Sequence, residues 1–256
     1  MTEILRFENV NLFLENNHIL KDINFQMKKG ENWAIIGRNG SGKSFLLRII
    51  STYQYPSNGK VFIMGNKLGE TNVWNLRKKI GIVSDDLQKE YKETTTVSNV
   101  ILSGFFSSIG IYEEPDLEMI KKKDQILDFL DLNHIKDKPF GKISYGEQKR
   151  TLIGRALVFD PDLLILDEPA TGLDIASKEE FLLYIQKLIE NDHSIIYVTH
   201  HIDEIVSGIN KVLILKNGKI FATGDKDKIL QDKILTQAFD IKIKCKKKRE
   251  RYFYSV

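Results

Sequence analysis

The strongest pattern in the chain is the segment Gly37-Arg38-Asn39-Gly40-Ser41-Gly42-Lys43-Ser44. It matches the phosphate-binding loop pattern G-x-x-x-x-G-K-[ST] at every fixed position. An apolar run that predicts a buried strand, Trp33–Ile36, comes before it, and a predicted helix, Phe45–Ile50, comes after it. A glycine-rich turn without a ligand seldom combines the lysine, the hydroxyl and both flanks. The segment therefore predicts that the chain binds a nucleotide.

Each residue type in this loop has a physical role. Glycines let the backbone curl so that successive amides point at phosphate oxygens, and the helix that follows adds its positive end. We expect Lys43 to reach the terminal phosphates and the Ser44 hydroxyl to bind magnesium. The predicted phosphate-binding residues are Gly37, Asn39, Gly40, Ser41, Gly42, Lys43 and Ser44.

A second signal is an apolar strand that ends in two acids. Leu163–Leu166 leads directly into Asp167 and Glu168. Ligands of open α/β sheets collect at the carboxyl ends of the strands, where such acids are held rigidly. We expect Asp167 to hold a magnesium-bound water and Glu168 to face the attacking water as a general base. A strand end capped by solvated acids is the structural alternative, which the nearby phosphate loop disfavours.

Apolar strand patterns alternate with helical ones along most of the chain, which predicts an α/β fold with a parallel sheet. Early residues instead predict antiparallel strands, at Leu5–Phe7, Asn11–Leu14 and Ile23–Met27. Between about residues 89 and 159 helical patterns follow one another without strands, which indicates a helical insertion. The strands predicted for the parallel sheet are Trp33–Ile36, Ile80–Ser84, Leu163–Leu166, Ile195–Thr199 and Val212–Leu215, and the further helices are Val97–Leu102, Leu117–Leu130, Tyr145–Val158 and Phe181–Ile189.

The segment Ile143-Ser144-Tyr145-Gly146-Glu147-Gln148-Lys149-Arg150 resembles the signature of the ATP-binding cassette (ABC) ATPases. The usual pattern is Leu-Ser-Gly-Gly-Gln, of which Ser144 and Gly146 are retained, while Ile143, Tyr145 and Glu147 depart from it. The resemblance covers roughly residues 4 to 235. It implies a P-loop NTPase (RecA-like) core with an antiparallel β subdomain and an inserted α-helical subdomain.

The resemblance also implies how the site is completed. In this family the phosphate loop of one subunit and the signature of another clamp the same ATP, so we expect a homodimer or a paired ABC subunit around two ATP molecules with Mg²⁺. The signature residues acting in trans would be Ser144, Gly146 and Glu147, at a helix start that favours an anion. Taken alone, Ser144 is an ordinary helix N-cap.

Two further segments resemble functional elements of this family. Asp174 ends Pro169–Asp174, which is similar to the loop that communicates across the dimer. His200 resembles the switch histidine that contacts the γ-phosphate, with the adjacent His201 as its rival. We therefore expect Glu168 and His200 to be the catalytic pair.

The chain departs from the family pattern at two positions. The glutamine that normally follows the strand into the helical lobe and touches magnesium aligns with Asp85, and Gln88 follows three residues later. Gln88 is the predicted metal ligand if the loop is lengthened. For adenine stacking the matching residue is Phe13, which is equally compatible with a place in the core. Gly30–Ala34 and the Ser-x-Gly-Glu pattern resemble molybdenum-transport-like members, a similarity that does not identify a substrate.

Composition narrows the functional classes. The chain has 256 residues, a formal charge of +3 and a single cysteine, Cys245, which favours a reducing, cytoplasmic setting. The sequence contains no run of about 20 apolar residues and no secretory start. Residues 240–256 hold seven Lys or Arg against two acids, so the remainder carries −2. An acidic body argues against nucleic-acid binding.

The sequence therefore predicts the ATP-hydrolysing subunit of an ABC transporter that drives a separate integral membrane permease from the inner face of the membrane. A soluble switch acting in translation, DNA maintenance or defence is the alternative, and an unrelated phosphate-loop kinase or GTPase is disfavoured by the signature. We expect an ATP-binding domain over 1–240, with its helical subdomain at about 89–159. Residues 241–256 would form a basic tail, in which Ile241–Lys244 could form an edge strand.

Overall fold

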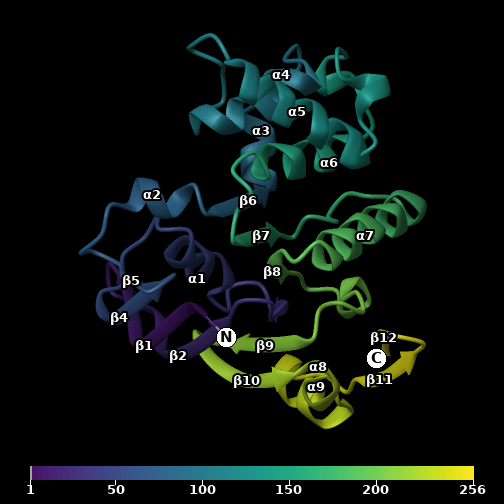
Figure 1. Ribbon diagram of the computed structural model, residues 1–256. Coiled ribbons are helices and arrows are strands. Elements are labelled where there is room, and N and C mark those ends of the chain that lie inside the picture. The colour runs from purple at the N-terminus through teal and green to yellow at the C-terminus, as the bar shows by residue number, and fades with distance from the viewer. Residues whose placement is uncertain (1) are drawn as a thin grey trace.

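Six strands form the central sheet in the computed structural model, which describes residues 2–256 (Figure 1). Every residue of β3 and β8 is buried, which explains why these strands are apolar throughout. All neighbours in the sheet are parallel except β10, which runs antiparallel to β9. In spatial order the strands are β10 (Lys219–Asp225), β9 (Lys211–Lys216), β3 (Trp33–Ile36), β8 (Ser194–Val198), β7 (Leu163–Asp167) and β6 (Ile80–Ser84).

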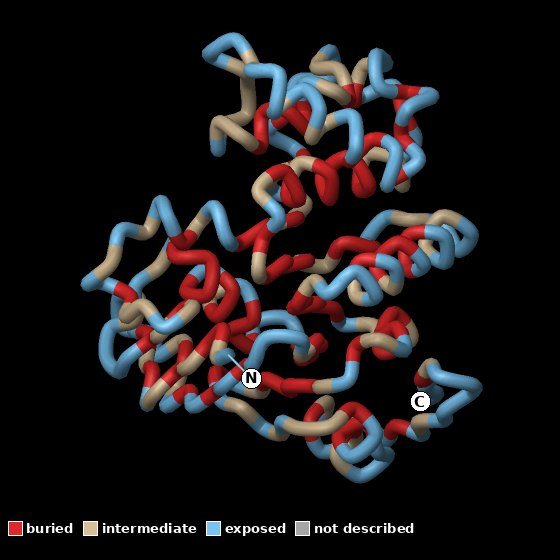
Figure 2. Tube along the Cα trace, in the orientation of Figure 1, coloured by how far each residue is buried: buried red, intermediate tan, exposed pale blue. Residues whose placement is uncertain are grey.

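The two faces of this sheet pack into two separate cores (Figure 2). Along β3, Trp33 and Ile35 join one core, which also contains α1 (Lys43–Ile50) and the antiparallel strands. Ala34 and Ile36 join the other core, with helices of the second lobe. Because side chains alternate along a strand, burial on both faces fixes the register of β3 and with it the start of the glycine loop.

The N-terminal strands form a four-stranded antiparallel sheet. The prediction of two strands at Leu5–Phe7 and Asn11–Leu14 was wrong in one respect, because a single strand, β1, covers both. The register of β1 against its partners shifts near Asn9, whose φ is +50°, so a bulge interrupts the apolar alternation without ending the strand. In spatial order the strands are β2 (Asn17–Lys28), β1 (Glu3–Leu14), β4 (Asn58–Ile63) and β5 (Asn66–Lys67).

Helices fill the chain between β6 and β7 and form a lobe above the sheet (Figure 1). The first of them begins at Asp85, directly after β6, where a loop was expected. Among residues 2–256, every helix is too short or too polar to cross a lipid bilayer. The α-helices are α2 (Val73–Arg77) before β6, then α3 (Asp85–Glu90), α4 (Val97–Leu102), α5 (Leu117–Phe129) and α6 (Tyr145–Ala156) in the lobe, and α7 (Ile175–Glu190) after β7.

The C-terminal residues fold back onto the body. Helices α8 (Lys226–Ile229) and α9 (Asp232–Phe239) are followed by a hairpin of β11 (Lys244–Lys248) and β12 (Arg251–Ser255). The edge strand predicted at Ile241–Lys244 was wrong, because Ile243 is buried and its N–H donates to Thr236 Oγ1 instead of to a strand.

Candidate active site

The central sheet brings the chemically suggestive segments to one edge. Strands β3, β8, β7 and β6 are parallel neighbours, so their carboxyl ends lie side by side. Ser84, Asp167 and Val198 pair in register at the ends of three of them. The glycine loop follows β3, the acids end β7 and the histidines follow β8. This is the edge at which parallel sheets bind ligands.

The glycines of the loop hold backbone geometry that side chains would obstruct. Gly40 and Gly42 have φ values of +77° and +105°, in the left-handed region that favours glycine. At Gly37 an added Cβ would lie 2.3 Å from the carbonyl oxygen of Leu215. The loop therefore lies directly on β9 at Gly37, and it enters α1 through the left-handed cap Gly42.

Two polar groups of the loop are suited to phosphate. The Lys43 ammonium is buried and donates to the carbonyl oxygen of Gly37 at 2.9 Å. The Ser41 hydroxyl is buried and has no hydrogen-bond partner within residues 2–256, an arrangement that an acceptor from a ligand would complete. Asn39 and Ser44 are exposed, Ser44 in the first turn of α1.

The acids at the end of β7 are held in an unfavourable environment. Burial, together with the nearby charge of Glu168, raises the pKa of Asp167 to about 6, although the Lys43 ammonium acts in the opposite direction. Burial lowers the pKa of Lys43, which both carboxylates act to raise. A desolvated carboxylate fits a hard divalent cation such as Mg²⁺, which prefers oxygen ligands.

Glu168 lies next to the predicted switch histidine. Its φ of +46° is strained for a residue with a side chain, and its N–H donates to the carbonyl oxygen of Val198 at 2.9 Å. The carboxylate Oε1 lies 3.4 Å from Nδ1 of His200. The ring of His201 packs on that of His200, with centroids 4.1 Å apart. The structure therefore brings His200 to the predicted base.

The signature segment begins α6 with a closed capping box. The Ser144 hydroxyl accepts from the Glu147 N–H at 3.3 Å, and the Glu147 carboxylate accepts from the N–H and the hydroxyl of Ser144, both at 2.7 Å. Burial raises the pKa of Glu147, but the Ser144 hydrogen bonds and His134 outweigh it, so the net pKa is lowered. The carboxylate of Glu147 thus already accepts from the N–H and the hydroxyl of Ser144, which are two of the donors at the start of α6.

The predicted dimer-communication residue caps the next helix. Asp174 accepts from the N–H of Ser177 at 3.0 Å and from its hydroxyl at 2.9 Å, at the start of α7. An added Cβ on Gly172 would lie 2.9 Å from the Tyr145 ring, and one on Gly146 would lie 3.6 Å from Ser177. The loop of Asp174 and the signature are therefore in contact within one chain.

Both candidates for the missing family glutamine lie in α3 and face α6. The Gln88 amide nitrogen donates to Gln148 Oε1 at 2.6 Å, while its own Oε1 is buried without a partner within residues 2–256. Asp85 forms an ion pair with Lys149, whose side chain is fully buried. Asp85 also raises the pKa of Asp167. The amide of Gln88 is thus engaged by the signature helix, and its role at magnesium remains a prediction.

Phe13 lies near the end of β1, on its exposed side and outside the core. Its ring stacks on that of His18, with centroids 4.1 Å apart and planes 19° apart, and 45% of the residue is exposed. An exposed aromatic surface on β1 and β2 is compatible with stacking on a base. No local pattern in the chain indicated that His18 would stack on this ring.

Comparisons with known proteins agree with this geometry. The model of the family described as ABC transporter matches residues 20–171. The ABC transporter ATP-binding protein YlmA of Bacillus subtilis is 40% identical over 253 residues, covering 98% of this chain and 96% of the relative.

Two solved structures extend this likeness to the fold. The structure of cbiO1 from Clostridium perfringens, part of the ABC transporter complex cbiONQ, superposes with a TM-score of 0.79 at 30% identity, covering 93% of this chain and 94% of that one. The dimeric cassette MJ0796 in a post-hydrolysis state with ADP and Pi gives a TM-score of 0.73 at 27% identity, covering 87% of this chain and 98% of that one.

Proposed function

Because the chain belongs to the ABC transporter family as an ATP-binding, ATP-hydrolysing subunit, we propose that two copies close around two ATP molecules and drive a separate membrane permease. The observation that carries the proposal is the meeting of four functional groups at one sheet edge. There Lys43 and Asp167 interact electrostatically, and Glu168 lies 3.4 Å from His200.

The phosphate loop would bind the triphosphate through its backbone amides and Lys43. Ser44 and Asp167 would hold Mg²⁺, with Gln88 a further candidate if α3 rearranges. A bound Mg²⁺ would supply positive charge to the phosphate oxygens. Phe13 would stack on adenine. The remaining residues of the loop proposed to contact phosphate are Gly37, Asn39, Gly40, Ser41 and Gly42.

Glu168 would act as the general base for the attacking water. Its carboxylate is oriented by a strained backbone and lies beside His200, which would hold the water and contact the terminal phosphate. Because Glu168 and His200 come just after buried strands, they would need to move little during the hydrolytic step.

The second half of each site would come from the partner subunit. Ser144, Gly146 and Glu147 lie at the start of α6 in the helical lobe, whereas the phosphate loop lies at the sheet edge of the other lobe (Figure 1). Pairing head to tail would bring one against the other, with Asp174 at the junction. The dimeric form of the cassette MJ0796 with ADP and Pi supports the pairing of two subunits.

The permease is a separate polypeptide in this proposal. The relative cbiO1 is part of a transporter complex, and the part of the chain that the structure describes offers no membrane-spanning helix. We therefore place the subunit at the inner face of the membrane through its permease. The cargo would be chosen by that partner.

The test is Glu168→Gln, with Glu118→Gln on an exposed face of α5 as the control. We expect the variant to bind ATP, to lose at least about 99% of its turnover, and to run as a dimer on gel filtration with ATP and Mg²⁺. The control should turn over ATP normally and dimerise only transiently. A Glu168→Gln variant that stays monomeric with saturating ATP contradicts the shared site.

A further inference from the structure

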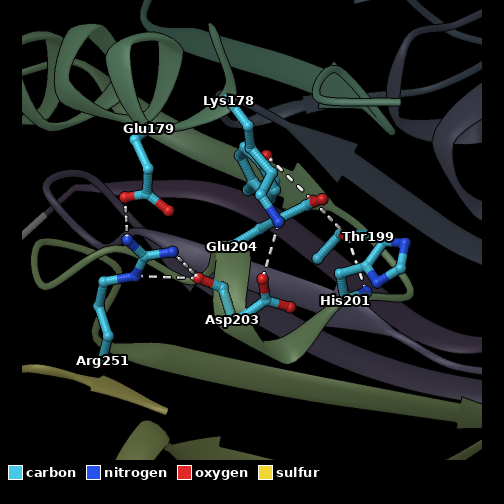
Figure 3. Close-up of polar contacts among 8 residues, drawn as sticks. Lys178, Glu179, Thr199, His201, Asp203, Glu204 and Arg251 are labelled. Atoms are coloured by element: carbon cyan, nitrogen blue, oxygen red, sulfur yellow. Dashed lines mark hydrogen bonds and ion pairs between the residues drawn. The ribbon is translucent and has the colours of Figure 1, made fainter. Parts of the chain in front are cut away.

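The short helical turn η4 (Ile202–Glu204) directly follows the two histidines, and polar contacts hold it on both sides (Figure 3). On the inner side Glu204, which is 3% exposed, accepts from the Thr199 hydroxyl at 2.6 Å and from the Tyr197 hydroxyl at 3.3 Å. Thr199 in turn accepts from the N–H of His201 at 2.9 Å. The backbone on both sides of His200 is therefore tied to η4.

On the outer side, η4 is tied to α7 and to the C-terminal hairpin. Lys178 of α7 pairs with the Asp203 carboxylate at 2.8 Å. Arg251 of β12 donates from Nε to the carbonyl oxygen of Asp203 at 3.0 Å and from Nη2 to the same oxygen. Its Nη1 pairs with Glu179 of α7. One guanidinium thus connects the turn after the switch histidine to the helix that Asp174 caps.

The hairpin that presents Arg251 is itself anchored in the body. The neighbouring Tyr252 is 5% exposed and belongs to the core that also contains Ala34, Ile36 and helices of the helical lobe. Its hydroxyl donates to Asp227. Lys247 also pairs with Asp227, at 3.2 Å, and the N–H of Cys245 donates to Asp232 at 2.7 Å. Arg251 is therefore held by a fixed element, and its side chain can restrain the turn against movement.

The chemistry of the contact suits a positioning role. A guanidinium offers planar donors in a fixed fork, so it can hold a carbonyl and a carboxylate in one geometry. Its partner here is a backbone carbonyl three residues beyond His200, so the contact restrains the main chain itself. A lysine carries its donors on a single nitrogen, so it lacks the planar fork that reaches both acceptors in one fixed geometry. Charge-assisted hydrogen bonds of this kind are also stronger than neutral ones.

We propose that Arg251 is a positioning residue for ATP hydrolysis, which acts through Asp203 and η4 to keep His200 at Glu168. The proposal rests on the role of His200 under the proposed function. A restraint of this kind acts on the hydrolytic step more than on nucleotide binding, because the phosphate loop has no part in it. The same contacts give the otherwise unassigned basic C-terminal residues a function in the ATPase.

The test compares Arg251→Met with Lys246→Met, which removes the same charge from an exposed position of the same hairpin. We expect Arg251→Met to lower kcat about tenfold, below the roughly hundredfold that a 1 Å displacement of a reacting group can cost, with KM for ATP changed less than about twofold. Amide hydrogen exchange over residues 201–205 should accelerate in this variant alone. Arg251→Lys, which keeps the charge but loses the planar fork, should recover part of kcat and provides the measurement if Arg251→Met folds poorly.

His200→Ala in the same assay separates the two proposals. If His200→Ala lowers turnover and Arg251→Met in that background lowers it no further, the positioning role is supported. If His200→Ala lowers turnover but Arg251→Met and Arg251→Lys match Lys246→Met, the positioning role is wrong and the proposed function stands. Normal turnover of His200→Ala overturns both the proposed catalytic role of His200 and the positioning role of Arg251. Losses that multiply independently in the double variant overturn the positioning role.

Discussion

Replacing Asp167 by asparagine should stabilise the chain in the absence of nucleotide while removing its ATPase activity. The carboxyl group ends a buried strand, and burial and Glu168 together raise its pKa to about 6 even though Lys43 attracts it. At neutral pH the folded chain therefore holds a charge that is less stable there than in water. Asparagine has nearly the same shape and carries no charge, so it removes that cost.

The magnitude follows from the pKa difference. A rise in the pKa of Asp167 from 3.8, the value of a free aspartate, to about 6 in the folded chain lowers the free energy of unfolding by about 3 kcal/mol once the group is ionised. Because the folded-state pKa is raised, the folded chain keeps the proton where the unfolded chain has lost it. The free energy of unfolding of the wild type therefore falls as pH rises from about 4 to about 6 and levels off above that. Asp167→Asn should therefore raise the free energy of unfolding by about 3 kcal/mol at pH 8 and by about half of that at pH 5.

Urea denaturation at pH 5 and pH 8, without nucleotide, measures this gain. Asp137→Asn, at an exposed position of the helical lobe, is the matched control and should change the free energy of unfolding by less than about 0.5 kcal/mol at either pH. Adding ATP with Mg²⁺ should stabilise the wild type more than the variant. An Asp167→Asn variant that is no more stable than the wild type at pH 8, or a gain equal at both pH values, refutes the reasoning.

Two further predictions concern the contacts of α6. Asp85→Asn should lower the free energy of unfolding by about 3 kcal/mol, because it leaves the fully buried Lys149 ammonium without a counter-ion. Lys149→Met should lower it by only about 1 kcal/mol, because the Asp85 carboxylate can rehydrate. Urea denaturation that gave the reverse order would contradict this account of the buried pair. Glu147→Gln should let ATP induce dimers at about fivefold lower concentration, since it removes a negative charge from the helix start that is proposed to receive phosphate. Sedimentation velocity across an ATP titration measures this, and an unchanged midpoint would show that Glu147 does not compete.

The central sheet could be predicted because each of its strands is specified locally. Trp33–Ile36 and Ile80–Ser84 were predicted with the bounds that the structure gives, and Leu163–Leu166 is one residue shorter than β7. These runs are apolar on both faces, so no alternation had to be judged. The segments proposed to be catalytic follow such strands directly, which is why their shared edge could also be predicted.

The parts that were missed depend on contacts between distant residues. Nothing local marks Lys149 as buried, because its partner Asp85 lies 64 residues earlier. The sequence of the β11 and β12 hairpin is that of a basic tail, but the burial of Tyr252 and contacts such as the pairing of Arg251 with Glu179, 72 residues away, attach it to the body. Charge composition describes the solvent-facing residues of such a segment, whereas its attachment depends on a few contacts with residues distant in sequence.

Three energetically unfavourable features of the molecule lie at the edge where ATP is proposed to bind. Glu168 has a left-handed backbone, Asp167 is ionised only at the expense of stability, and the Ser41 hydroxyl is buried without a partner within residues 2–256. The strands behind that edge are fully buried and regular, so they can hold these groups in place. Groups that are held in position and poorly solvated need little reorganisation when charge arrives. Nucleotide and cation binding should therefore relieve the strain and desolvation that the folded chain carries without them, which links the stability of the site directly to its occupancy.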